Sequence, residues 1–266
     1  MEKLRVITLF SGYDSQCLAL ERLKQNYPPL FDYELVAWCE IDKNAIDAHN
    51  ILFPQWEDRN VGDICEVDPT KLPDCDLITF SFPCQAISSA GLQGGLTEGS
   101  GTTSSLVWKC FKIFKEKRPK FLLLENVKAL IQKKFLPQFQ LIQQRLEELG
   151  YTNFVKVLNA KDYGVPQNRE RVFMVSVLNC EKPYIFPTPF PLALRLKDVL
   201  EENAPEEYYL SDDKVQRILD HCNRKMAEGC GFKPSMHEAD RGGYSNTITS
   251  KYGNRETDPL LKIKDE

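Results

Sequence analysis

A cysteine at the end of an apolar run is the first candidate for chemistry. Residues 80–91 read FSFPCQAISSAG, and Cys84 stands between a proline and a glutamine. A thiolate is a good nucleophile for covalent catalysis, and Pro83 favours a rigid turn that would present the thiol at the end of a strand. The alternative is that Cys84, one of nine cysteines, packs as a small apolar side chain.

Charged side chains beside two later apolar runs are further candidates. Glu125 ends the apolar run in LLLENV, where desolvation would raise its pKa unless a cation pairs with it. Arg169 and Arg171 occur in GVPQNRERVFMV. Alternate residues of a strand share a face, so both guanidinium groups could point the same way. A structural ion pair and a solvated edge strand are the competing interpretations.

Small and acidic residues follow the first two apolar runs. Gly12 lies in FSGYDSQ, but GxGxxG would need three glycines, so the dinucleotide signature is weak. Glu40 ends the second run, where a carboxylate can accept hydrogen bonds from ribose hydroxyls. Asp63, in the expected turn VGDI, could accept from an adenine amino group. Each acidic residue is also explained as a cap or turn residue.

Alternating apolar runs and amphipathic stretches predict the elements that position these residues. Strands are expected at 4–10, 33–40, 76–82, 120–126, 151–160 and 171–178, and helices at 14–25, 43–53, 105–117 and 135–150. This alternation predicts an α/β fold with helices on both faces of a mostly parallel sheet, the last two strands being antiparallel. Ligands of such sheets bind at the carboxyl ends of the strands. Phe10, Glu40, Phe82 and Glu125 lie at four of these ends.

Two segments depart from this alternation. Residues 85–104 form a long loop of mainly small residues, which predicts a movable lid. Residues 183–195 carry four prolines and indicate a linker. The sequence therefore predicts one domain at 1–185 and a smaller region at 186–266, with a hairpin or loop at 242–254.

Composition limits the partners. A net charge of −4 does not favour nucleic acid by bulk electrostatics, although a local basic face is enough to contact phosphates. We expect no metal, because the three histidines are scattered. We expect no membrane, because the sequence has no long apolar span. Cysteines in apolar runs and the lack of a signal peptide favour the cytoplasm.

In their order along the chain, these motifs resemble the DNA (cytosine-5) methyltransferase family of bacteria and phages. The resemblance covers about residues 4–178 and rests on Phe10-x-Gly12, Glu40, Asp63, PCQ (83–85), ENV (125–127) and QNRER (167–171). It implies a Rossmann-like methyltransferase sheet that binds S-adenosylmethionine at 1–185. It also implies a partial target-recognition region at 186–266, double-stranded DNA as the partner, and the cytoplasm of a bacterial or phage-infected cell.

The resemblance also implies roles for single residues. The Cys84 thiolate would add to C6 of a flipped-out cytosine, so that C5 can take the methyl group. A protonated Glu125 would stabilise N3, and Arg171, supported by Arg169, would stabilise O2. The implied substrate contacts are Gln85, Ser88 and Gln167. The implied cofactor contacts are Phe10, Gly12, Tyr13, Asp14, Glu40, Ile41, Asp63, Ile64 and Pro83.

The sequence departs from the family pattern in two places. Asp14 and Ser15 stand where the family usually has glycines, and Asp14 either pairs with the ammonium group of the cofactor or caps the following helix. The usual LTPxE-like and closing segments are not found, since the chain ends in YGNRETDPLLKIKDE. The missing segments leave a non-catalytic or split subunit that needs a second chain as an alternative. A tRNA cytosine-5 methyltransferase is a further alternative, because base flipping and cysteine addition also work on tRNA.

Overall fold

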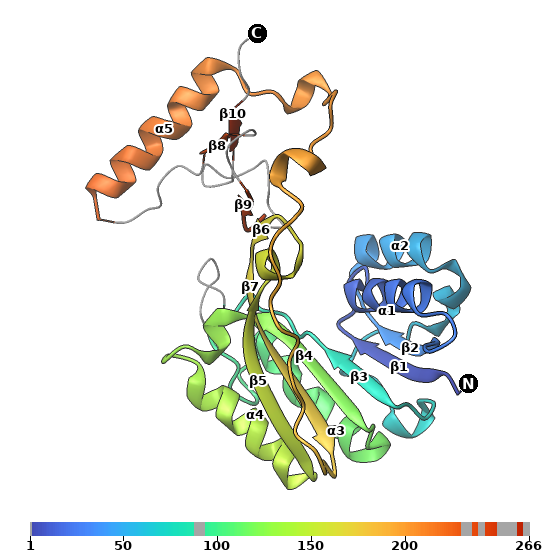
Figure 1. Ribbon diagram of the computed structural model, residues 1–266. Helices are drawn as coiled ribbons and strands as arrows, with labels where there is room; N and C mark the ends of the chain where they lie inside the picture. Colours follow the sequence, from blue (N-terminus) through green and yellow to red (C-terminus); the bar gives the residue numbers. More distant parts are fainter. Residues whose placement is uncertain (1, 88–93, 230–235, 239–242, 249–259, 263–266) are drawn as a thin grey trace. The chain divides into compact units, whose positions relative to one another are not determined.

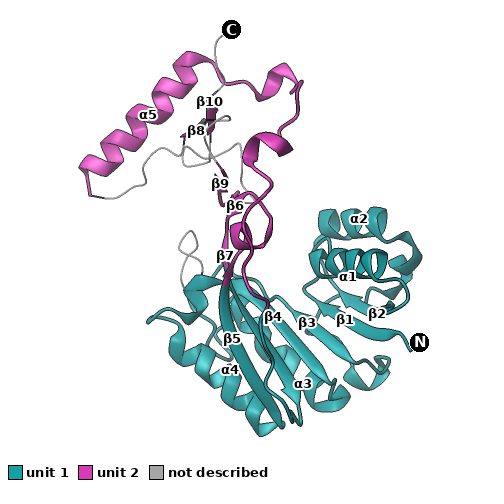
Figure 2. Cartoon of the chain, viewed as in Figure 1, with its two compact units in different colours: residues 1–157, 171–186 teal, residues 158–170, 187–266 magenta. Residues whose placement is uncertain are grey.

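The computed structural model describes residues 2–87, 94–229, 236–238, 243–248 and 260–262. The chain divides into two units (Figure 2). The first unit consists of residues 1–157 and 171–186, and the second of residues 158–170 and 187–266. The expected boundary at 185 therefore lies close to the last division, but the sequence pattern did not assign 158–170 to the second unit.

A six-stranded sheet, almost entirely within the first unit, has the strand order β2-β1-β3-β4-β7-β5 (Figure 1). Its strands are β1 (Leu4–Leu9), β2 (Tyr33–Cys39), β3 (Leu77–Phe80), β4 (Phe121–Val127), β5 (Tyr151–Asn159) and β7 (Glu170–Leu178). β1 is parallel to β2 and β3, β3 is parallel to β4, and β7 is antiparallel to β4. The predicted strands and the mostly parallel α/β sheet are confirmed.

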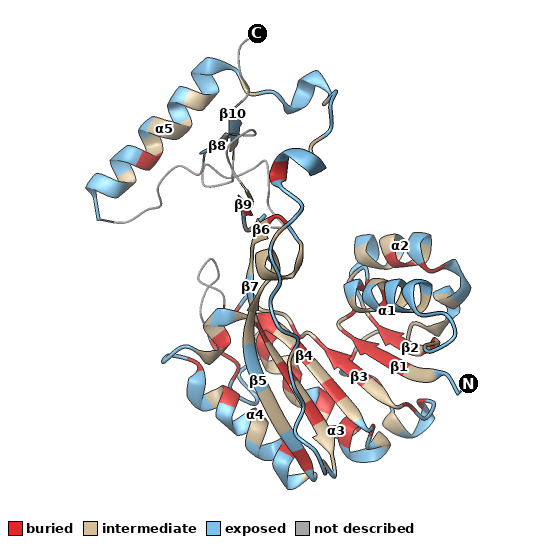
Figure 3. Ribbon diagram, viewed as in Figure 1, coloured by how far each residue is buried: buried red, intermediate tan, exposed pale blue. Residues whose placement is uncertain are grey.

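Helices cover both faces of this sheet. They are α1 (Ser15–Asn26), α2 (Lys43–Leu52), α3 (Val107–Lys117) and α4 (Leu136–Glu148), as the periodicity predicts. Val6 and Leu35 pack with Cys17 of α1 on one face, where Ile46 of α2 joins them. The strand residues that point to the opposite side of the sheet pack against α3 and α4 and form the other face. Buried residues therefore line both faces of the strands, while the outer sides of the helices are exposed (Figure 3).

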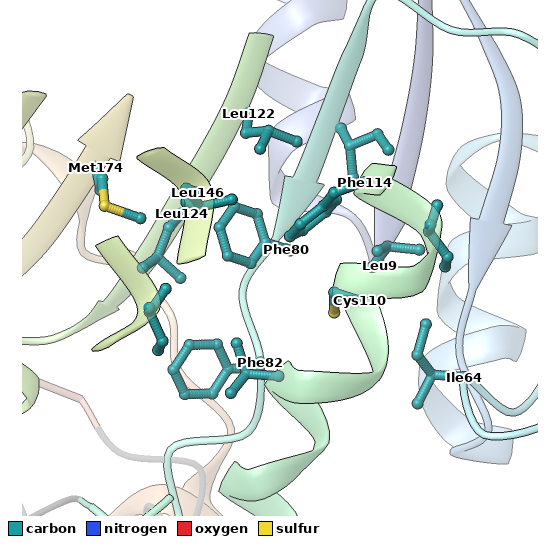
Figure 4. Close-up of a cluster of buried hydrophobic side chains, with 14 of the residues drawn as sticks. Leu9, Ile64, Phe80, Phe82, Cys110, Phe114, Leu122, Leu124, Leu146 and Met174 are labelled. Carbon is teal, nitrogen blue, oxygen red and sulfur yellow. The ribbon is translucent and has the colours of Figure 1, made fainter. Parts of the chain in front are cut away.

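The larger core cluster lies between the sheet and the pair α3 and α4. Phe80 of β3 meets Phe114 of α3 edge to face, with ring centroids 4.9 Å apart. Leu122 and Leu124 of β4 and Leu146 of α4 complete this part of the cluster (Figure 4). Close packing of these side chains fixes β3 and β4 side by side, and with them the segments that follow each strand.

The second unit contains two short parallel pairings and one long helix. β6 (Gln167–Asn168) pairs with β9 (Ser245–Asn246), and β8 (Met236–Glu238) pairs with β10 (Leu260–Lys262). The described part of the expected hairpin at 242–254 therefore pairs with β6. The sequence analysis missed helix α5 (Asp212–Ala227), although Ser211 caps it and two aspartates open it.

Short 3₁₀ helices connect these elements. They are η1 (Pro54–Arg59), η2 (Pro69–Lys71), η3 (Thr103–Leu106), η4 (Lys128–Ile131), η5 (Ala160–Tyr163), η6 (Leu196–Val199) and η7 (Glu206–Tyr208).

A cavity of about 560 Å³, lined by Arg5, Asp76 and Lys120 among others, opens at the amino ends of the strands. Parallel sheets bind their ligands at the opposite end. No helix in the described part of the chain is long and apolar enough to cross a membrane.

The core predicts a clear contrast between two truncations. Phe114→Ala removes a fully buried ring and should lower the free energy of unfolding by about 3–5 kcal/mol. Ile51→Ala, at a side chain that is 80% exposed on α2, should change it by less than about 0.5 kcal/mol. Urea denaturation followed by circular dichroism measures both, and equal losses would contradict the assignment of the core.

Candidate active site

The carboxylate of Glu40 ties together the turns that follow β1 and β2. It accepts hydrogen bonds from the backbone N–H groups of Gly12 at 2.9 Å, Ile41 at 2.8 Å and Asp42 at 2.9 Å. Gly12 has a φ of +59°, and a Cβ built on it would meet nothing within 4 Å. The turn therefore has a fixed backbone beside open space, which suits the close approach of a ligand.

Asn60 holds the next turn beside the end of β2. Its side-chain oxygen accepts from the N–H groups of Glu40 at 3.2 Å and Gly62 at 3.0 Å, and its amide donates to the Glu40 carbonyl at 3.1 Å. Asp63 then accepts from the Cys65 N–H at 2.8 Å, as an Asx turn does. The expected turn at VGDI is confirmed, and it brings a second carboxylate to the neighbourhood of Glu40.

Apolar side chains next to these turns differ in exposure. Tyr13 and Ile41 are 53% and 68% exposed, so both can cover a planar ligand. Phe10, at a φ of +57°, packs partly against the core. Ile64 is only 3% exposed and belongs to the core cluster. The implied contact of Ile64 with the cofactor stays a prediction, and its side chain packs against the core beside the turn.

Asp14 caps helix α1, which settles the two alternatives for this residue. Its side chain is fully buried. One oxygen accepts from the Cys17 N–H at 3.0 Å and the other from the Thr8 hydroxyl at 2.7 Å. The implied cofactor contact of Asp14 is wrong in this structure, because a carboxylate closed off from solvent and bonded at both oxygens cannot pair with the ammonium group of a ligand.

A buried imidazole lies against Asp14. His49 Nε2 is 3.7 Å from Asp14 Oδ2, and the His49 ring stacks on Trp38 with centroids 3.8 Å apart. Burial raises the pKa of Asp14 and lowers the pKa of His49. The lowered pKa of His49 favours its neutral form, so the imidazole beside Asp14 carries no charge in the folded protein at neutral pH. The sequence offered no signal for this long-range contact.

Side chains from two other segments hold the backbone around Cys84. Asn126 donates to the Phe82 carbonyl at 3.0 Å, which ties the end of β4 to the segment after β3. Ser104 donates to the Pro83 carbonyl at 2.6 Å and accepts from the Ala86 N–H at 3.3 Å. The sequence analysis gave neither residue a role. Asn126 could have been noticed as a polar residue at a buried position of the strand alternation in β4.

Exposure separates Cys84 from the buried cysteines. Burial raises the pKa of Cys39 and of Cys75 to about 12, and thiols of this kind are inert at neutral pH. Cys84 is half-buried and packs on the edge of the core. Among the described cysteines, Cys65 and Cys180 are also accessible. Of these three, only Cys84 follows a central parallel strand, since Cys180 follows β7, which runs antiparallel to β4.

Glu125 and Arg171 form an ion pair across β4 and β7. Arg171 Nε is 3.1 Å from Glu125 Oε1, and the two side chains are 17% and 27% exposed. Arg171 lies opposite Val127, two residues beyond Glu125, so the pair is a diagonal contact on one face of the sheet. The sequence singled out both residues, and the structure brings them together at the carboxyl end of β4.

The remaining predicted residues lie elsewhere. β7 begins at Glu170, so Arg171 lies within the strand and Arg169 stands just before it. Arg169 and Gln167 belong to the second unit. Gln85 is exposed and accepts from the Thr103 hydroxyl at 3.0 Å. Ser88 and the rest of residues 88–93, which belong to the loop proposed as a lid, lie outside the described residues.

The residues around the first two strand ends fit S-adenosylmethionine. Two carboxylates can accept from hydroxyl and amino groups, two exposed apolar side chains can cover a base, and Gly12 leaves space beside its turn. Within the described ranges there is no group of three His, Cys, Asp or Glu side chains that could hold a metal ion.

Comparison with known proteins identifies the family. The family model for C-5 cytosine-specific DNA methylases matches residues 4–265. The chain belongs to this family. The Type II methyltransferase M2.ScrFI of Lactococcus lactis subsp. cremoris is 51% identical over 259 residues, which cover 80% of this chain and 71% of that protein. M.NlaX of Neisseria lactamica is 34% identical over 248 residues, covering 93% and 75% respectively.

The fold of this methylase also has solved counterparts. The Dnmt2 methyltransferase of S. pombe superposes with a TM-score of 0.75 at 18% identity, over 99% of this chain and 78% of that one. At that identity the likeness concerns the fold. As a member of its family, the chain is an enzyme that transfers a methyl group from S-adenosylmethionine to C5 of cytosine in DNA.

The buried pair of His49 and Asp14 predicts a pH dependence of stability. His49 takes up a proton near its usual pKa of about 6.5 when the chain unfolds, but resists it when folded. The unfolded state therefore binds more protons at His49 as the pH falls, so His49 lowers wild-type stability between pH 7.5 and pH 5.5, whereas the raised pKa of Asp14 contributes with the opposite sign. In His49→Phe, the part of this loss due to His49, about 1 kcal/mol, should disappear. Equal losses in urea titrations of both proteins would contradict the neutral imidazole.

Proposed function

We propose that Cys84 is the nucleophile of the methyl transfer. Its thiolate attacks C6 of a flipped-out cytosine, and the electron pair of the C5–C6 double bond moves towards C5 and the ring. The single observation that carries this proposal is the way the Cys84 segment is built. The backbone carbonyls of Phe82 and Pro83 are both held by buried side chains, at the end of a central parallel strand.

Glu125 and Arg171 are proposed to stabilise the negative charge that reaches the ring. A protonated Glu125 donates to N3, and Arg171 faces O2. The ion pair at 3.1 Å supports this assignment, because one contact delivers both groups to the same strand end. In the bound state Arg171 would turn towards the base and so release the Glu125 carboxylate for protonation. Arg169 and Gln167 are proposed as supporting contacts to the DNA strand.

The cofactor is proposed to lie at the ends of β1 and β2. Glu40 would accept from its ribose, Asp63 from its adenine amino group, and Tyr13 and Ile41 would cover the base, beside Phe10, Gly12 and Pro83. Bound there, the methyl sulfonium supplies the group that C5 accepts. Removal of the C5 proton and departure of the Cys84 thiolate from C6 then restore the aromatic ring.

The two regions expected from the sequence are proposed to divide the work. Residues 1–185 carry catalysis and cofactor binding, and in this region Gln85 and Ser88 contact the flipped base. Residues 186–266 contribute to recognition of the DNA target. The cytoplasm of a bacterial or phage-infected cell is the proposed location, because the substrate is DNA and the relatives named above are bacterial proteins.

A second chain is a separate proposal. It would supply the closing segment that the family pattern places beside the first turn. Methyl transfer measured with these 266 residues alone, and again after addition of a candidate second chain, tests this idea. Equal activity in the two measurements would count against it.

Replacement of Cys84 tests the nucleophile. Cys84→Ser should form no denaturation-resistant adduct with duplex DNA that contains 5-fluorocytosine, and should lose methyl transfer by at least about 10³-fold. The matched control is Cys65→Ser, an exposed cysteine of the same unit, which should behave like the wild type. Adduct formation by Cys84→Ser would overturn the assignment. Preferred methyl transfer by the wild type to tRNA over duplex DNA would favour the RNA alternative.

Replacement of Glu125 tests the proton donor. Glu125→Gln keeps the shape of the side chain but cannot transfer a proton to N3, so adduct formation should slow by about 10²–10⁴-fold. Glu34→Gln is the matched control, since Glu34 pairs with Arg59 at 2.8 Å in the same unit but lies near the amino end of β2. If both variants lose the same small amount of stability and no rate, the Glu125 pair is structural.

A further inference from the structure

The hydroxyl of Ser104 connects the two ends of the long loop that begins after Cys84. Ser104 is fully buried at the entrance to α3. Its hydroxyl donates to the Pro83 carbonyl at 2.6 Å and accepts from the Ala86 N–H at 3.3 Å. A serine hydroxyl has one donor and two acceptor positions, so a single side chain can make both bonds at once.

The two backbone groups that Ser104 holds lie on either side of Cys84. The Pro83 carbonyl belongs to the peptide that enters Cys84, and the Ala86 N–H lies two residues beyond it. The Cys84 carbonyl in turn accepts from the Ile87 N–H at 3.0 Å, which closes a turn. Both peptide planes next to the Cys84 Cα are therefore restrained, and these planes set the direction in which the Cys84 side chain leaves the backbone.

Neighbouring hydrogen bonds brace the base of the loop without contacting Pro83 or Cys84. Gly95 N–H donates to the Ala86 carbonyl at 2.9 Å, and the Thr102 hydroxyl donates to the Gly95 carbonyl at 2.9 Å. Removing the Ser104 hydroxyl would leave the Pro83 carbonyl and the Ala86 N–H without this partner in a buried place, which is costly. The Cys84 segment is then expected to shift.

We infer that Ser104 is a positioning residue for the Cys84 thiol. It acts through the backbone of Pro83 and Ala86, and sets the angle and distance at which the sulfur meets C6 of the target base. This inference rests on the proposed role of Cys84. A displacement of about 1 Å at a reacting atom can cost on the order of 10²-fold in rate while substrate binding is kept.

Four variants test the inference in single-turnover and steady-state assays. Ser104→Ala should slow adduct formation and lower kcat by about 10–100-fold, with KM for DNA and for S-adenosylmethionine within about twofold of the wild type. Ser104→Thr, which keeps the hydroxyl, should recover most of the rate. Ser105→Ala is the matched control, because the Ser105 hydroxyl in the same turn donates to the Thr102 carbonyl at 2.7 Å and does not hold Pro83 or Ala86, so the rate of this variant should be unchanged. Ser104→Cys replaces Ser104→Ala if the latter does not fold.

Each outcome decides one question. A Ser104→Ala protein that keeps the wild-type kcat, or that loses activity only through a raised KM, overturns the positioning role. A loss equal to that of Ser105→Ala also overturns it, since it would reflect the stability of the turn. Cys84→Ser separates the two proposals: an active Cys84→Ser protein sinks the nucleophile, whereas an inactive one beside a fully active Ser104→Ala protein sinks only the role of Ser104.

Discussion

Parallel pairing on both sides of β1 is the constraint on which the site depends. β2 lies on one side of β1 and β3 on the other, so the chain that leaves these strands turns away in opposite directions. A ligand at the carboxyl ends of such strands meets backbone on both sides. The Glu40 carboxylate organises one side, and the segment around Cys84 the other. Their arrangement is thus set by the core that aligns the strands.

Side-chain hydrogen bonds satisfy the backbone groups of these turns, as backbone hydrogen bonds between neighbouring strands do within the sheet. Turns that leave a sheet expose backbone N–H and C=O groups that need partners when buried. Glu40 satisfies three N–H groups, Asn60 holds the next turn, and Asn126 and Ser104 hold the carbonyls before Cys84. Each of these residues lies far in sequence from at least one of its partners. The irregular part of the protein is therefore as closely determined as the sheet.

Sequence patterns predicted what depends on local order. Apolar alternation gave the strands, and the residues at their ends gave Glu40, Cys84 and Glu125. Asp14 was undecided, because an acidic residue before a helix suits a cap and a ligand contact equally, and its burial arises from Thr8 and His49. The DNA sequence read by the enzyme is not predictable in this way, since groove contacts follow no residue code in irregular segments.

The division of the chain has a consequence for protein engineering. Residues 158–170 belong with 187–266, so the polypeptide passes between the units three times, after Val157, Glu170 and Phe186. A graft that exchanged only the residues after 186 would separate β9 from its partner β6, whose two residues precede the second crossing. An exchange of recognition regions between related methylases would therefore have to carry two segments, joined at three points in the chain.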